Sequence, residues 1–151
     1  MKSLEQMVRE NAEFAASTFK DTGSLTPMWI AECENGDILP IVAPMTDKDK
    51  IIAAVKALFR EHKVKRYVFM CEAWTIVGKS LDEARNRTTS LEHHPNRREI
   101  IMVSGEDGKQ TIMGHMFILR PEHGKPTVSP FTIQTMDRAE GRMTGLLPEK
   151  S

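Results

Sequence analysis

The run from Lys65 to Val77 is the longest β-like stretch of the chain, and it predicts a central strand. Side chains point alternately to the two sides of a strand, and here both sides are almost entirely apolar. Such a strand is typical of a sheet that is covered on both faces. The exception is Glu72, a carboxylate among bulky neighbours. Because a buried carboxylate needs a partner or a raised pKa, Glu72 is the most suggestive residue for function.

The length of 151 residues predicts a single domain that spans residues 1–151. Lys plus Arg and Asp plus Glu each number 21, so the formal net charge is zero. A nucleic-acid-binding protein usually carries a basic excess, so we expect no nucleic-acid partner. A chain without net charge offers little repulsion against association, which favours a homo-oligomer.

The cysteines and the chain start indicate the compartment. Cys33 and Cys71 form neither a disulfide framework nor a CxxC motif, so buried free thiols are the favoured interpretation. The first residues lack an apolar signal core, and no apolar run approaches membrane-spanning length. We therefore expect a cytoplasmic protein that has no membrane partner.

Capping and turn signals mark out the elements. Ser3 begins a helix with Gln6 in a capping-box pattern, Asn35-Gly36 indicates a hairpin turn, and Thr46 is a good cap for a second helix. Pro40 and Pro130 each indicate an edge strand, because proline has no N–H for a ladder. The expected helices are residues 3–20 and 46–63, and the expected strands are 28–34, 37–43, 65–77, 98–104, 110–120 and 127–134.

This order of elements predicts an α+β fold: a mostly antiparallel sheet of about six strands with two helices packed on one face. Residues 78–96 read as a long polar loop, and loops of this length are either functional or disordered. Residues 136–151 form a mostly polar C-terminal tail. Its Leu146-Leu147 pair is expected to dock on the domain or on a second subunit.

A metal site is one interpretation of the histidines. Glu72 with His93, His94 and His115 could hold a divalent metal and leave a position open for water. Glu72 and His115, on neighbouring strands, could face the same side of the sheet. Adjacent histidines in an extended segment point in opposite directions, however, and no HxH or HExxH pairing is present. The alternative is that the histidines are exposed beside a turn proline.

Glu72 has two further interpretations. It could act as a general acid or base, or Arg97 or Arg98 could neutralise it across the ladder as a structural ion pair. The two arginines could instead bind an anion together with the loop arginines Arg85 and Arg87. Glutamates are interspersed among them, so a solvated surface of mixed charge is the competing account.

The stretch from about Arg66 to Pro148 resembles small bacterial or phage proteins that carry no assigned function. The resemblance rests on Glu72-Ala73-Trp74, on residues 94–99 and on the strands that follow. It implies a compact cytoplasmic domain and offers no catalytic residue to carry over.

Two functional hypotheses follow. The first is a non-enzymatic, self-associating binding or regulatory module, which rests on the missing catalytic motifs, the zero net charge and the open sheet edges. The second is a metal-assisted hydrolase or other small-molecule enzyme that uses Glu72 as base and the histidines as ligands. A weaker third option is an adaptor whose loop arginines bind an anionic partner.

Overall fold

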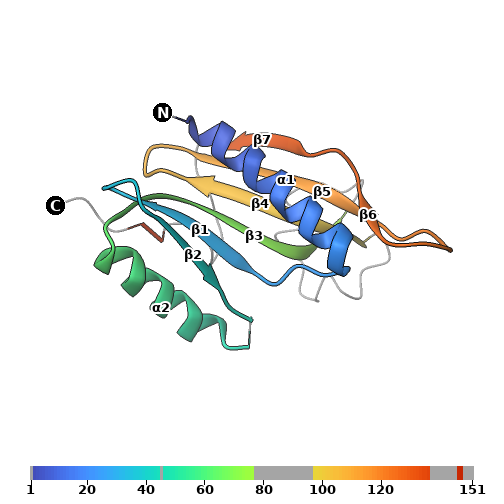
Figure 1. Cartoon of the computed structure of the whole chain (residues 1–151), viewed down its shortest axis with the longest axis horizontal. Coiled ribbons are helices and arrows are strands. Elements are labelled where there is room, and N and C mark those ends of the chain that lie inside the picture. The colour runs from blue at the N-terminus through green and yellow to red at the C-terminus, as the bar shows by residue number, and fades with distance from the viewer. Residues whose placement is uncertain (1, 45, 77–96, 137–145, 148–151) are drawn as a thin grey trace.

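The computed structural model describes residues 2–44, 46–76, 97–136 and 146–147 (Figure 1). This part of the chain contains two helices and a seven-stranded antiparallel sheet, so the predicted α+β fold class is confirmed. None of its helices is both long enough and apolar enough to cross a membrane. The elements are α1 (Leu4–Thr22), β1 (Met28–Cys33), β2 (Ile38–Val42), α2 (Lys48–Glu61), β3 (Val64–Ile76), β4 (Arg97–Glu106), β5 (Thr111–Leu119), β6 (Thr127–Val128) and β7 (Thr132–Met136).

The strand order is β2-β1-β3-β4-β5-β6, and β7 also pairs with β5. The expected central strand is β3, which pairs with β1 on one side and with β4 over ten consecutive positions on the other. Strand β2 ends the sheet, as Pro40 predicted. The single strand expected at 127–134 is instead two short strands. Pro130 lies between them, and both pair with β5, at residues 118–119 and 111–115.

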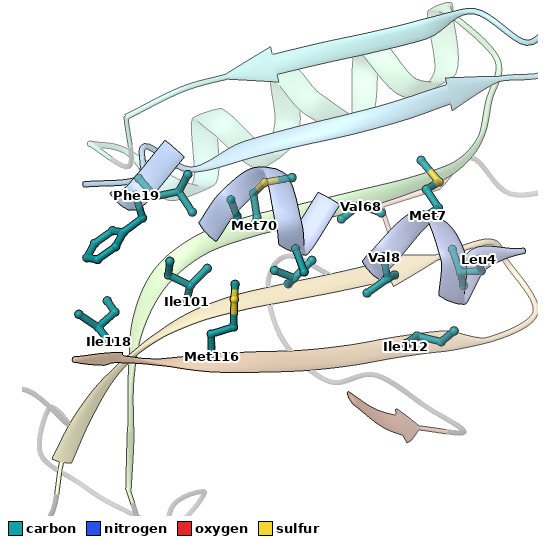
Figure 2. Close-up of a cluster of buried hydrophobic side chains, with 14 residues drawn as sticks. Leu4, Met7, Val8, Phe19, Val68, Met70, Ile101, Ile112, Met116 and Ile118 are labelled. Atoms are coloured by element: carbon teal, nitrogen blue, oxygen red, sulfur yellow. The ribbon is translucent and has the colours of Figure 1, made fainter. Parts of the chain in front are cut away.

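Helix α1 packs across β3, β4 and β5 and buries two even-numbered side chains in the middle of β3 (Figure 1). Val68 and Met70 lie completely buried beneath the helix. Figure 2 shows this α1-side core, in which helix side chains at spacings of three and four meet the strands. Its buried members are Leu4, Met7, Val8, Ala12, Ala15, Phe19, Leu25, Val68, Met70, Ile101, Val103, Ile112, Met116 and Ile118.

Helix α2 packs on the odd-numbered side chains of β3. The ring centroids of Phe59 and Tyr67 are 5.0 Å apart, and Trp29 and Phe69 lie in the same cluster. Because neighbouring strand residues point to opposite faces, the two helices cover opposite faces and do not share one as we expected. Leu146 is buried in this α2-side core, so the tail docks on its own domain at that residue.

The capping predictions are confirmed in part. The Ser3 side chain accepts a hydrogen bond from the Gln6 N–H at 3.1 Å, as the capping pattern predicted. Helix α2 is capped by Asp47, whose carboxylate accepts from the Lys50 N–H at 3.2 Å, and not by Thr46. The hairpin between β1 and β2 turns at the predicted place, with Gly36 at a φ of 93°.

Candidate functional site

Glu72 lies on the α1 side of β3 but is exposed, contrary to the buried position that its apolar neighbours suggested. Helix α1 ends at Thr22, and Gly23 at a φ of 80° turns the chain away before it covers this position. The Glu72 carboxylate accepts a hydrogen bond from the backbone N–H of Leu25 at 2.9 Å. Its observed role is therefore to hold the turn that follows α1.

The predicted ion pair between Glu72 and Arg98 does not form. In the ladder Glu72 is opposite Ile101, whereas Arg98 is opposite Thr75, three positions along. Odd and even positions of β3 face opposite sides, so Arg98 projects from the α2 side, where its guanidinium lies 4.3 Å from the ring centre of Phe117.

The remaining arginines of the proposed anion site lie at the edge of the described part of the chain or outside it. Arg97 is opposite Ile76 at the start of β4, and its side chain lies outside the described part. Arg85 and Arg87 also lie outside the described residues. Anion binding by Arg97 and Arg98 therefore stays a prediction.

An ion pair that the sequence did not reveal joins β4 to the residue after β5. Arg120 donates through Nε and Nη2 to the two carboxylate oxygens of Glu99, at 2.6 and 3.1 Å. The hydrogen bond and charge of Glu99, together with the charge of Glu72, raise the pKa of Arg120. The two partners are twenty-one residues apart, so only the strand register brings them together.

His115 does not share a face with Glu72. Glu72 and Met116 both face Ile101 in the ladders, so Glu72 lies on the same side as Met116. His115 projects from the opposite side, where its ring meets the ring of Phe117 edge-on at 5.1 Å. These two residues cannot bind one metal ion, because the sheet separates them.

The rest of the metal hypothesis is untested. His93 and His94 lie outside the described residues, so a site that combines them with Glu72 stays a prediction. Among the residues that the structure does describe, no group of three or more His, Cys, Asp or Glu side chains is arranged to hold a metal ion.

Neither cysteine has the surroundings of a nucleophile. Burial raises the pKa of the Cys33 thiol, and it raises the pKa of the Cys71 thiol to about 11. A thiol with a raised pKa holds little of the reactive thiolate at neutral pH. Both cysteines are free, as predicted; Cys33 is buried, whereas Cys71 is only partly buried.

Two buried polar pairs serve the fold. Tyr67 donates to the Glu106 carboxylate at 2.7 Å, and burial raises the pKa of Tyr67. Arg66 donates to the Glu32 carboxylate through Nε and to the Lys2 carbonyl at 2.7 Å through Nη1. Both pairs join segments distant in sequence, as structural pairs do.

The most distinctive surface lies on the α1 side of β1 and β2. Helix α1 packs on β3, β4, β5 and β6, and Figure 1 shows β1 and β2 beyond its edge. Neither described helix covers this face, and on it Ile38 and Val42 are each 56% exposed. The register places them beside Glu32 and Met28, with Pro40 and Ile30 between them. Cross-strand partners share a face, so these apolar side chains form one strip.

Helix α1 carries a further exposed apolar side chain on its flank towards β1. Residues 9, 12, 16 and 20 of α1 face β5 and β6, and at about 100° per residue Phe14 projects from the other flank, towards β1. Phe14 is 48% exposed. We call the combined area the β1–β2 apolar surface; it consists of Phe14, Met28, Ile30, Ile38, Pro40 and Val42.

Comparisons with protein-family models, with curated proteins and with solved structures each found no match for this chain.

Proposed function

We propose that the protein is a small self-associating binding module in which a second copy of the chain covers the β1–β2 apolar surface. The observation that carries this proposal is the exposure of Ile38 and Val42 on one face of β2, together with the exposure of Phe14 on the flank of α1 that points towards β1. Isolated exposed apolar residues are ordinary, but a contiguous apolar patch is typical of an interface. Burial of such a patch is favourable in proportion to its apolar area.

The charge pattern favours a partner of the same composition. The strip between residues 28 and 30 and between 38 and 42 carries no charged side chain. Glu32, at its end, is already bonded to Arg66. The strip on β1 and β2 of a second copy therefore brings no charged side chain to the contact, and the zero net charge leaves little long-range repulsion.

The backbone hydrogen-bond pattern of β2 favours a dimer that forms through the apolar face of the sheet over one that forms by strand pairing at the β2 edge. Cys33 donates to the Asp37 carbonyl at 2.8 Å, and Ala43 donates to the Pro27 carbonyl at 3.2 Å. Antiparallel partners alternate between pairs that exchange hydrogen bonds and pairs that do not. Counted from these two hydrogen-bonded pairs, Pro40 and its partner Ile30 form a pair that exchanges no hydrogen bonds. The ring nitrogen of Pro40 therefore faces the open edge.

Residues 38, 40 and 42 of β2 direct their backbone nitrogens towards the open edge, and Pro40, the middle one, has no N–H to donate. Proline at such a position is a common protection of an edge strand against pairing. Among the described residues, no charged side chain interrupts the apolar strip on the face beside it. Leu146 is 2% exposed in its own core and is not available for the tail-mediated contact that the sequence also suggested.

The test is the molar mass in solution at micromolar concentration, measured by sedimentation equilibrium. We expect a dimer for the parent chain and a monomer for the double variant Ile38→Thr, Val42→Thr, because threonine keeps the strand but lowers the apolar contact. Leu119→Thr is the matched control, since Leu119 is 39% exposed on β5 and lies on the other face.

Three results decide the proposal. A dimer that survives Leu119→Thr but not the double variant supports it. A monomeric parent overturns it. A dimer that the double variant leaves intact would mean that the contact lies on another surface. Pro40→Val then tests the β2 edge, because the restored backbone N–H would strengthen a dimer that pairs through that edge.

A further inference from the structure

A groove lies on the flank of α1 that faces away from the β1–β2 apolar surface. One wall is α1, where Ala12 and Ala16 present small side chains one turn apart. The other wall is the segment from Val128 to Phe131, where the sheet edge breaks between β6 and β7. The groove has a volume of about 400 Å³, which is within the usual range for small-molecule sites.

The floor of the groove is apolar and firmly positioned. Met116 is 3% exposed at its base. Phe131 lies directly against Gly114: a Cβ at Gly114 would be 2.4 Å from the Phe131 ring, so only glycine admits the ring there. The break in the edge is held by Ser129, whose hydroxyl accepts from the Phe117 N–H at 2.8 Å and whose own N–H donates to the Phe117 carbonyl.

Three charged side chains line the groove, and two of them are cationic. Arg9 and Lys20 are eleven positions apart on α1, which is roughly 16 Å at the helical rise per residue. Glu13 lies between them and opposes an anion. Arg9 is already bonded through Nε to Glu5 at 3.3 Å, so the Lys20 end is the better place for a negative head group.

We infer that this groove binds a linear aliphatic carboxylate, with the alkyl chain on the apolar floor and the carboxylate beside Lys20. The floor gives the chain its hydrophobic contact, and the ammonium gives the head group an ion pair. A neutral alcohol of the same length gains only the first contribution. An amine of the same length also gains the hydrophobic contact, but its ammonium is repelled at the Lys20 end.

The experiment is isothermal titration of the parent chain with decanoate, decanol and decylamine, each below its aggregation concentration. We expect decanoate to bind more tightly than either decanol or decylamine. Lys20→Gln is expected to weaken decanoate roughly threefold or more, as for the loss of one exposed ion pair, and to leave decanol unchanged. Glu13→Gln is expected to strengthen decanoate.

A blocking variant locates the site. Ala16→Phe fills the groove and is expected to abolish binding of decanoate and decanol. Ser17→Phe adds the same ring to an exposed neighbour on α1 and is expected to leave binding intact. Circular dichroism confirms that both variants are folded.

Several results overturn the inference. These are no binding of decanoate, equal affinity for the three head groups, and decanoate binding that survives Ala16→Phe in the folded protein. Binding that is lost in the Ile38→Thr, Val42→Thr variant but kept in Ala16→Phe places the ligand on the β1–β2 apolar surface instead. The two surfaces lie on opposite flanks of α1, so the variants test the proposed dimer and the proposed ligand site independently of each other.

Discussion

The carboxylate of Glu72 accepts a 2.9 Å hydrogen bond from the backbone N–H of Leu25, a residue forty-seven positions earlier in the chain. Leu25 itself is buried in the α1-side core. The bond therefore fixes where the chain leaves α1 and where it enters β1. A structural role follows for the residue that the sequence marked as the leading functional candidate.

This role makes a prediction for Glu72. Glu72→Ala removes the acceptor and is expected to lower the free energy of unfolding by about 1 kcal/mol, the usual net value of a hydrogen bond. Glu72→Gln keeps an acceptor oxygen and is expected to lose less. Urea unfolding of the three proteins measures both changes. Equal losses in the two variants would show that the hydrogen bond is not what the carboxylate contributes.

Gly105 sets how closely α1 approaches the sheet. A Cβ at this position would lie 2.4 Å from Cγ2 of Val8. Gly105→Ala is therefore expected to lower the free energy of unfolding by about 1–3 kcal/mol through overpacking. Val8→Ala removes the atom that clashes, so the double variant is expected to lose less than the sum of the two single losses. Additive losses in chemical denaturation would contradict the close contact.

Local patterns predicted the elements well, because each depends on near neighbours in sequence. Ser3 and Gln6 are three residues apart, and the alternation along β3 is visible in a short window. That alternation, apolar on both sides, already indicated a sheet covered on both faces. The prediction that both helices pack on one face was inconsistent with this alternation.

The relations that failed all depend on register or on where a helix stops. The exposure of Glu72 follows from the end of α1 at Thr22, and the separation of Glu72 from His115 follows from the β3–β4–β5 pairing. The pairing of Glu99 with Arg120 and the contact of Arg98 with Phe117 depend on that same register. Several antiparallel arrangements suit one pattern of strands, so these side-chain relations were not readable from sequence.

Lys63 follows the capping residue of α2 in a left-handed conformation, with a φ of 53°. A side chain pays a steric cost in this conformation that glycine avoids. Lys63→Gly is therefore expected to raise the free energy of unfolding by about 0.5 kcal/mol. Lys56→Gly, in the interior of the same helix, is the matched control and is expected to lower it by about 1 kcal/mol. Thermal unfolding of both variants compares the signs, and a loss at Lys63 would contradict the prediction.

The pairing of Glu32 with Arg66 predicts a pH dependence of stability. The hydrogen bond and charge of Arg66 hold the pKa of Glu32 below its ordinary value of 4.5. Above that value the carboxylate is ionised in both the folded and the unfolded chain, and the pair contributes fully. As the pH falls towards the lower folded pKa, the unfolded chain takes up the proton first, so this stabilisation is lost.

Glu32→Gln removes this titration. The variant is expected to be less stable than the parent at pH 7, because Arg66 loses its anionic partner, and the difference is expected to shrink as the pH falls below about 4.5. Urea midpoints from neutral to acidic pH measure the convergence. A difference that stays constant over this range would show that the pair contributes packing and not charge.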